Sequence, residues 1–326
     1  DAMGGDNAPE SQVLGGFQAA SEMSDKIEVI LVGNKIKINE ILNSQNRSLD
    51  NLRIVNASEV INMEDSPSDA FKVKQDSSLT VALKLQVDNK ADAMISAGNT
   101  GAVLAASTLL LGRIKGISRP SIGSFFPTDA GKTMVFDVGA TVDCRPNHLL
   151  EFAQMGSIFM SYIFNIEKPR VGILSVGEEK SKGNDLTLEA YKLLENSGLN
   201  FIGNVEGRDV LRGKAEVIVC DGFIGNIVLK FAESIIDVLK SKFKQYADIG
   251  IWNKIKVGLS YGTLKDVIKD FDYQWYGGVP LLGVNGVAII GHGKSTPLAV
   301  KNMIIRAYDT VSKGVNLEIE KIIKNK

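Results

Sequence analysis

The sequence predicts an α/β protein with a doubly wound, mostly parallel sheet and a projecting helical hairpin. Short apolar, β-branched runs alternate with segments whose apolar residues recur at helical spacing, which is typical of a parallel sheet covered by helices. Several of these runs end in glycine-bearing turns, and one stretch, 231–270, has no strand signal. We therefore expect residues 1–326 to form a single α/β domain with an inserted hairpin.

The composition is that of an ordinary globular protein. Its 326 residues, 44% of them hydrophobic, are enough to bury one large core or two modest ones. Lysine plus arginine (37) nearly balances aspartate plus glutamate (38), so no overall field would attract nucleic acid. Cys144 and Cys220 lie far apart with only two histidines in the chain, so we expect neither a disulfide framework nor a metal site.

We expect a cytoplasmic protein. The chain has no run of about 18 uninterrupted apolar residues and no charged segment leading into the apolar stretch of an export signal. Its first residues, Asp1 to Asp6, already form a turn-like sequence. We therefore also expect a short strand before Asp1.

The predicted strands are short runs rich in apolar and β-branched residues. They are 27–33, 52–56, 93–98, 121–127, 133–139, 170–177, 201–205, 215–222 and 287–291. Segments between them with apolar residues at i, i+3 and i+4 predict helices, for example 79–87, 149–164, 187–194 and 227–239.

Glycine-bearing turns follow five of these strands. They are 96–101, 137–140, 175–178, 221–226 and 291–293. In an open α/β sheet, ligands bind at the carboxyl ends of strands, beside helix N-termini that favour anions. The sequence therefore predicts an active cleft assembled from these turns.

The stretch 231–270 predicts two successive helices broken by Gly250, Gly258 and Gly262. Apolar residues crowd around these glycines and alternate with Lys254 and Lys256. The apolar residues are Ile249, Ile251, Trp252, Ile255, Val257 and Leu259. These residues can contact anionic lipid, or they can be buried in the core of a dimer. The two alternatives are compatible if the inner faces of the two helices form the dimer and only the tip contacts lipid.

Two turns offer phosphate-binding groups. In the first, Gly4 and Gly5 stand between Asp1 and Asp6, where missing Cβ atoms would let backbone amides approach an anion. The second turn supplies hydroxyls, an amide and backbone N–H groups from Ser96, Gly98, Asn99, Thr100 and Gly101. Plain turn chemistry is the commoner role of a motif like the first, although its place at a strand end favours function. A helix N-cap at Asn99 or Thr100 explains the second equally well.

Two further turns carry candidate polar side chains. Lys182 and Asn184 follow a strand end, where a lysine can meet a phosphate dianion or an oxyanion, although a charged loop is usually solvated surface. Asp221 and Gly222 precede Asn226, which can donate to an oxygen, while Asp221 can orient a cation or cap the helix.

His292, between two glycines at a strand end, is a candidate proton donor. The segment 291–296 is not a P-loop, because Ala288 stands where the first glycine should be. The chain has neither G-x-G-x-x-G nor G-x-S-x-G, so neither a dinucleotide site nor a serine acyl-enzyme is expected.

Taken together, these segments resemble the phosphate acyltransferase family of bacterial phospholipid synthesis. The segments that carry the resemblance are 1–9, 96–102, 203–209, 221–226, 276–283 and 291–293, in order through nearly the whole chain. Thr141 departs from the asparagine expected in 137–143, which puts a side-chain role there in doubt.

The resemblance implies a fold like those of phosphate acetyltransferases and isocitrate dehydrogenases, a homodimer, and no cofactor. It also implies a reaction of acyl carrier protein thioester with inorganic phosphate, giving acyl phosphate for a membrane glycerol-3-phosphate acyltransferase. We assign Lys182 and Asn226 to phosphate and oxyanion contacts, His292 to the departing thiolate, and the glycine turns to phosphate.

Two other functions remain open from the residues alone. One is a metal- and NAD-dependent dehydrogenase on the same sheet, which the missing glycine fingerprint and sparse metal ligands disfavour. The other is a non-catalytic dimeric module that recruits partners to a membrane surface. Phosphate-dependent consumption of acyl carrier protein thioester distinguishes both from the acyltransferase.

Overall fold

The protein is described by a computed structural model that covers residues 1–45, 48–129, 131–268 and 273–324. Its helices are α1 (Glu10–Glu22), α2 (Lys35–Asn43), α3 (Pro67–Val73), α4 (Ser78–Val87), α5 (Thr100–Leu110), α6 (Pro146–Phe164), α7 (Asp185–Glu195), α8 (Asp209–Arg212), α9 (Gly222–Asp248), α10 (Ile251–Ile268), α11 (Pro297–Ser312) and α12 (Val315–Lys324). Its strands are β1 (Val29–Gly33), β2 (Leu52–Asn56), β3 (Ala93–Ser96), β4 (Ser121–Thr128), β5 (Gly131–Phe136), β6 (Val171–Leu174), β7 (Phe201–Val205), β8 (Val217–Val219), β9 (Val279–Leu282) and β10 (Val287–Ile290).

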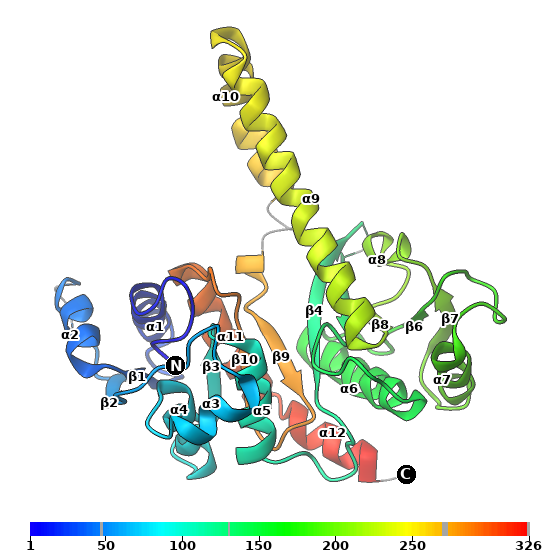
Figure 1. The fold of residues 1–326 in the computed structure, drawn as a ribbon, viewed down its shortest axis with the longest axis horizontal. Helices are drawn as coiled ribbons and strands as arrows, with labels where there is room; N and C mark the ends of the chain where they lie inside the picture. The colour runs from blue at the N-terminus through cyan, green and yellow to red at the C-terminus, as the bar shows by residue number, and fades with distance from the viewer. Residues whose placement is uncertain (46–47, 130, 269–272, 325–326) are drawn as a thin grey trace.

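Two lobes flank the base of a helical hairpin (Figure 1). An eight-stranded sheet in the order β3-β10-β9-β4-β5-β8-β6-β7 runs through both lobes, and β1 and β2 form a separate parallel pair. The α/β class and the projecting hairpin are therefore confirmed. The division of the chain into one domain stays a prediction.

The direction of the large sheet reverses in its middle. The pairs β3–β10, β5–β8, β8–β6 and β6–β7 are parallel, whereas β10–β9, β9–β4 and β4–β5 are antiparallel. Two parallel blocks that run in opposite directions are thus joined through β9 and β4.

Each of the nine predicted strands is present, but β9 was missed. This strand has only four residues, one of them Pro280, and it follows Gly277 and Gly278, so its sequence reads as a turn. Its neighbours override that local preference, because β9 pairs with β10 on one side and β4 on the other. The strands β6 and β8 are shorter than predicted, because the predicted ranges included residues of the turns that follow them.

Alternate side chains of β4 and β5 supply two cores on opposite faces of the sheet. Phe126 and Val135 join one core with residues of α4 and α5, and Phe125 and Phe136 join the other with residues of α6 and α7. The sheet is therefore covered by helices on both faces, as in a doubly wound fold.

The hairpin consists of α9 and α10, which pack against each other and project from the body (Figure 1). The helix α9 is a single 27-residue helix that starts at Gly222, so the hairpin arm begins nine residues before the predicted boundary at 231. Predicted hairpin residues 269–270 lie outside the described residues. In the parts of the chain that the structure describes, no helix has both the length and the apolarity needed to cross a membrane.

The first residues lie between β1 and β3. The Asp1 amino group donates to the Ile95 carbonyl oxygen at 3.0 Å, and the Ala2 N–H donates to the Val32 carbonyl oxygen at 2.8 Å. Both strands also line a cavity of about 360 Å³. The expectation that a strand precedes Asp1 stays a prediction.

We expect Gly123→Ala to destabilise the protein. A Cβ on Gly123 would lie 2.1 Å from the Phe136 ring, which is fully buried in the adjacent strand. Overpacking of this kind typically costs about 1–3 kcal/mol. Urea denaturation measures the loss; Gly207→Ala is the matched control, because a Cβ there meets nothing within 4 Å. Equal stability of the two variants would contradict the packing argument.

Candidate functional site

Turns at the carboxyl ends of β3 and β10 meet the N-terminal turn, and we call residues 1–6, 96–101 and 291–295 the β3–β10 cluster. The Asp1 carboxylate accepts hydrogen bonds from the Ser96 hydroxyl at 2.6 Å and from the Met3 N–H at 3.1 Å. The Asp6 N–H donates to the Gly293 carbonyl oxygen at 2.7 Å. The structure therefore brings together three turns that the sequence singled out separately.

The backbones in this cluster approach so closely that glycine is required. A Cβ on Gly4 would lie 2.4 Å from an Asp1 carboxylate oxygen and 2.9 Å from the Gly98 nitrogen. Gly5 has a φ of +110°, and a Cβ there would lie 3.0 Å from the Gly293 carbonyl oxygen. These glycines serve close packing of backbone against backbone.

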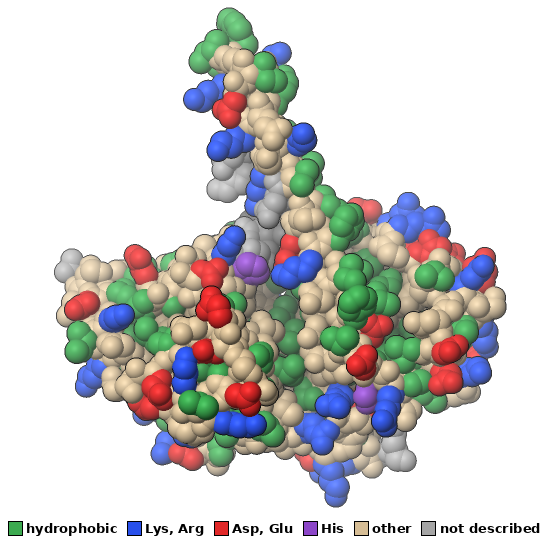
Figure 2. Space-filling model, in the orientation of Figure 1, with side chains coloured by type: hydrophobic (Ala, Val, Ile, Leu, Met, Phe, Trp, Pro, Cys, Tyr) green, Lys and Arg blue, Asp and Glu red, His purple; other side chains and the backbone are tan. Residues whose placement is uncertain are grey.

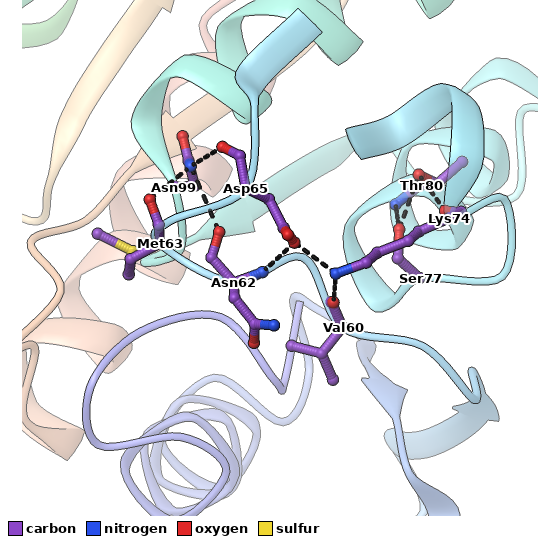
Figure 3. Close-up of polar contacts among 8 residues, drawn as sticks. All are labelled: Val60, Asn62, Met63, Asp65, Lys74, Ser77, Thr80 and Asn99. Atoms are coloured by element: carbon purple, nitrogen blue, oxygen red, sulfur yellow. Dashed lines mark hydrogen bonds and ion pairs between the residues drawn. The ribbon is translucent and has the colours of Figure 1, made fainter. Parts of the chain in front are cut away.

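The Asn99 side chain is occupied by structural hydrogen bonds. Its oxygen caps α5 by accepting from the Ala102 N–H at 3.0 Å, and its Nδ2 donates to the carbonyl oxygens of Met63 and Asp65 at 3.0 and 3.2 Å. Lys74 holds the same loop, through the Asp65 carboxylate and the Val60 carbonyl oxygen (Figure 3). The helix-cap interpretation of Asn99 is therefore confirmed.

His292 lies exposed in the turn after β10. Its Nδ1 accepts the Lys294 N–H at 3.1 Å, and its carbonyl oxygen accepts from the Ser295 hydroxyl at 2.6 Å. Because Nδ1 is an acceptor, a proton on the neutral ring sits on Nε2. That nitrogen is the one able to donate a proton to a ligand.

A second group of turns follows β5 and β8, and we call residues 137–141 and 221–226 the β5–β8 cluster. The Asp221 carboxylate caps α9 by accepting the Ile224 N–H at 2.8 Å, so its predicted capping alternative is confirmed. Asn226 lies in the first turns of α9 with its amide nitrogen 3.4 Å from the position a Cβ on Gly139 would take. Gly222 donates its N–H to the Thr141 carbonyl oxygen at 2.8 Å.

Asp137 holds the β5–β8 cluster and was not among the predicted site residues. Its carboxylate accepts the N–H groups of Gly139, Ala140 and Thr141 at 3.1, 2.9 and 2.7 Å. Thr141 takes part here through its backbone N–H, a contact that does not depend on the side chain at this position. An aspartate directly before a glycine turn at a predicted strand end was the available signal.

Lys182 and Asn184 lie on the loop after β6, and Lys182 contacts Asn204 of β7, on the side of β6 that faces away from β8. Asn184 caps α7 by accepting the Thr187 N–H at 2.9 Å. Lys182 is exposed, and its carbonyl oxygen accepts hydrogen bonds from Ser175 and Asn204. Neither side chain lines the cavity described next, and the roles assigned to both stay predictions.

A cavity of about 530 Å³ connects the two clusters, within the range of small-molecule sites. Turn residues of both clusters line it: Asp6, Gly98, Thr100, Gly101, His292 and Gly293 on one side, and Gly139 and Asn226 on the other. Ser124 of β4 and Lys230 and Glu233 of α9 add further polar side chains. Its apolar lining includes Leu104, Phe125, Phe126, Leu211, Leu229 and Val279. The other predicted residues, among them Asp1, Gly4, Gly5, Ser96, Asp221 and Gly222, support these turns from outside the lining.

Among the residues that the structure describes, no group of three or more histidine, cysteine, aspartate or glutamate side chains is arranged to hold a metal ion. The lining holds the charged side chains of Asp6, Lys230 and Glu233 and, as uncharged polar groups, backbone amides, hydroxyls, an amide and an imidazole. Uncharged groups of these kinds bind and orient an anion or a carbonyl oxygen.

Asp137 should make stability depend on pH. Burial raises the pKa of its carboxyl from 3.8 to about 6, despite the three N–H groups that it accepts. The folded state then binds a proton more tightly than the unfolded chain, so this contribution favours folding at low pH and is lost as the pH rises from about 4 to about 6. The full change is about 3 kcal/mol.

The measurement is the free energy of unfolding in urea between pH 4.5 and 7.5. Relative to Asp137→Asn, the parent protein should lose stability across this range. Asp143→Asn, on the same loop with an exposed side chain, is the control and should leave the slope of the parent curve nearly unchanged. Parallel curves for the parent and Asp137→Asn would contradict the prediction.

Comparison with proteins of known sequence identifies relatives over the whole chain. The model of the family described as "Fatty acid synthesis protein" matches residues 1–318. A phosphate acyltransferase from Geotalea daltonii is 46% identical over 327 residues, covering 100% of this chain and 94% of that protein. A phosphate acyltransferase from Chlorobaculum tepidum is 45% identical, covering 98% of this chain and 100% of that protein.

Solved structures share the fold at low sequence identity. A phosphotransacetylase from Streptococcus pyogenes superposes with a TM-score of 0.62 at 16% identity, covering 92% of this chain and 91% of that one. The EutD phosphotransacetylase from Staphylococcus aureus gives a TM-score of 0.59 at 17% identity, covering 93% and 92%. On the strength of its full-length sequence matches, the chain belongs to the fatty acid synthesis protein family to which these phosphate acyltransferases belong.

Proposed function

We propose that this enzyme is an acyltransferase that moves a fatty acyl group from an acyl carrier protein thioester to inorganic phosphate. The observation that carries the proposal is the cavity between the two clusters, which joins anion-binding turns to an apolar wall. A phosphate and a thioester carbonyl suit the turns, and a fatty acyl group suits the wall. Family membership supports the same reaction.

The chemistry needs little from the protein beyond positioning and electrostatics. Inorganic phosphate is already partly a dianion near neutral pH, and a thiolate of pKa about 8.5 is a tolerable leaving group. A phosphate oxygen attacks the carbonyl carbon, a C–O bond forms, and the C–S bond breaks as the tetrahedral oxyanion collapses. The products are the acyl phosphate and the thiol of the carrier, without a covalent acyl-enzyme.

The residues that face the cavity can take these roles. The turn 98–101 at the N-terminus of α5 offers backbone N–H groups and the Thr100 hydroxyl to the phosphate. The Asn226 amide can donate to the oxyanion, and His292 Nε2 can protonate the departing thiolate. Lys182 would add its charge from the loop after β6, outside the cavity lining.

Asn226→Ala and Lys182→Ala should each lose activity while the fold stays intact. Removing one donor to a transition-state oxyanion typically costs about 100-fold or more in rate. The assay follows thiol release from acyl carrier protein thioester in phosphate buffer that contains a chelator and no nucleotide.

Asn196→Ala is the control, since Asn196 lies at the far end of α7. It should keep parental kcat/KM. A near-normal kcat/KM for phosphate and thioester in either test variant would remove that residue from the mechanism.

A homodimer is the assembly that the hairpin favours. Exposed apolar side chains recur at spacings of four and seven along α9, which places them on one face: Phe223, Ile227, Phe231 and Val238. Figure 2 shows hydrophobic side chains along this arm where it leaves the body. The same face of a second copy would cover them from water.

The hairpin tip suits contact with a membrane surface. Trp252 and Leu259 are 75% and 82% exposed, and the lysines Lys254 and Lys256 are exposed beside them. Hydrophobic side chains gather at the tip with basic ones below (Figure 2). A cytoplasmic enzyme docked on lipid in this way would release its apolar product close to a membrane glycerol-3-phosphate acyltransferase.

Replacing Trp252 and Leu259 together by glutamate should abolish binding to vesicles that contain anionic lipid. Each substitution puts a negative charge where an apolar side chain would enter the interface. Vesicle co-sedimentation, with dimer mass and thioester activity in solution measured in parallel, tests this expectation.

The dimer and the solution activity should persist. The control replaces Val73 and Leu109, exposed apolar residues on the body, by glutamate. Loss of the dimer or of the fold, or vesicle binding at the parental level, would show that the tip does not contact lipid.

A further inference from the structure

The apolar part of the cavity between the two clusters has a shape and lining that a phosphate site alone does not need. Its floor follows β4. Val138 in the β5–β8 cluster donates its N–H to the Ile122 carbonyl oxygen at 3.0 Å, so Ile122 lies level with that cluster. Phe126 and Pro127 line the cavity further along the same strand. From Ile122 to Pro127 the strand rises about 17 Å, at about 3.3 Å per residue.

Two helices form the walls, and each presents a polar side chain followed one turn later by apolar ones. On α5, Thr100 precedes Leu104, and on α9, Asn226 precedes Leu229. Residues three or four apart lie on one helix face. Each wall therefore presents apolar side chains one turn beyond a polar turn residue, and on α9 the charged Lys230 and Glu233 lie at the edge of this apolar surface.

The far part of the cavity is bordered by α8. Leu211 lines the cavity there, and its carbonyl oxygen accepts the Asp129 N–H at 3.4 Å, just beyond the end of β4. The charged lining residues among those described are Asp6 in the N-terminal turn and Lys230 and Glu233, which form an exposed ion pair of 3.0 Å. The stretch between these positions can therefore hold an apolar chain without burying a charge.

We propose that this apolar stretch along β4 binds the fatty acyl chain and that Leu104 and Leu211 limit the chain length that it accepts. The inference rests on the proposed function for the identity of the ligand. In this arrangement the face of α9 that lines the cavity, with Leu229 and Ala232, contacts the substrate. The exposed apolar face of the same helix contacts the second protomer of the dimer. Each methylene moved from water into such a site favours binding about fourfold.

Leu104→Trp tests the assignment, because a larger side chain there fills the stretch that a long chain occupies. The probes are hexadecylphosphonate and octylphosphonate, unreactive compounds whose binding is measured by titration calorimetry. The parent should bind the longer probe at least about 100-fold more tightly. The variant should lose at least about tenfold for the longer probe and stay within about twofold for the shorter one.

Leu109→Trp is the matched control. Leu109 lies on the same helix but is 62% exposed and does not line the cavity, so this variant should bind both probes as the parent does. Leu211→Trp, at the opposite end of the stretch, should reproduce the chain-length effect if Leu104→Trp fails to fold. Acyl carrier protein thioesters of sixteen and eight carbons should show the same selectivity in kcat/KM.

The outcomes separate the chain site from the proposed function. Equal loss for both probes in the two tryptophan variants, or a parent that does not distinguish the probes, would overturn the chain site. A different outcome would keep the chain site and reject the acyl transfer. In that outcome, the parent distinguishes the two probes, both tryptophan variants reduce this discrimination, and no phosphate-dependent thiol release is detected.

Discussion

Three antiparallel pairings in the middle of the large sheet determine where the site lies. In a wholly parallel sheet, turns at the carboxyl ends of strands share one edge. Here the pairs β10–β9, β9–β4 and β4–β5 are antiparallel, so the strands of the β3–β10 block run opposite to those of the β5–β8 block. The carboxyl ends of the two blocks therefore point in opposite directions along the sheet. The cavity lies over β4 between the two blocks and is lined by turn residues of both.

The helix α9 links the cavity to the hairpin. Asp221 fixes its first turn, Asn226 and Leu229 line the cavity, and the same helix continues without a break to Asp248. A Cβ on Gly225 would lie 1.8 Å from the Asp137 carbonyl oxygen, so the start of the helix is packed directly onto the β5–β8 cluster. A rigid element of this kind holds the site and the projecting surface in a fixed relation to each other.

The sequence predicted the fold class, nine strands, the hairpin and the turns of the site, because each has a strong local signal. It missed β9, whose pairing with β10 and β4 overrides a proline and flanking glycines. It also offered Asn99 to phosphate, although the Met63 and Asp65 carbonyls occupy that amide. Which of several polar turn residues faces a cavity depends on contacts between segments far apart in the chain, and no local pattern encodes those contacts.

Both clusters use a carboxylate to fix a turn rather than to react. Asp1 holds the Ser96 hydroxyl, which itself accepts the Gly98 N–H at 3.1 Å, and Asp137 holds three successive N–H groups. Turns fixed in this way need not reorganise when charge develops on a bound anion, and this preorganisation is the largest contribution to many enzymatic rates. A reaction between a dianion and a thioester needs no nucleophile from the protein, so the most demanding part of the site is a backbone held in place. For the proposed transfer, Asp1 and Asp137 would thus contribute through the turns that they hold and not through contact with the substrate.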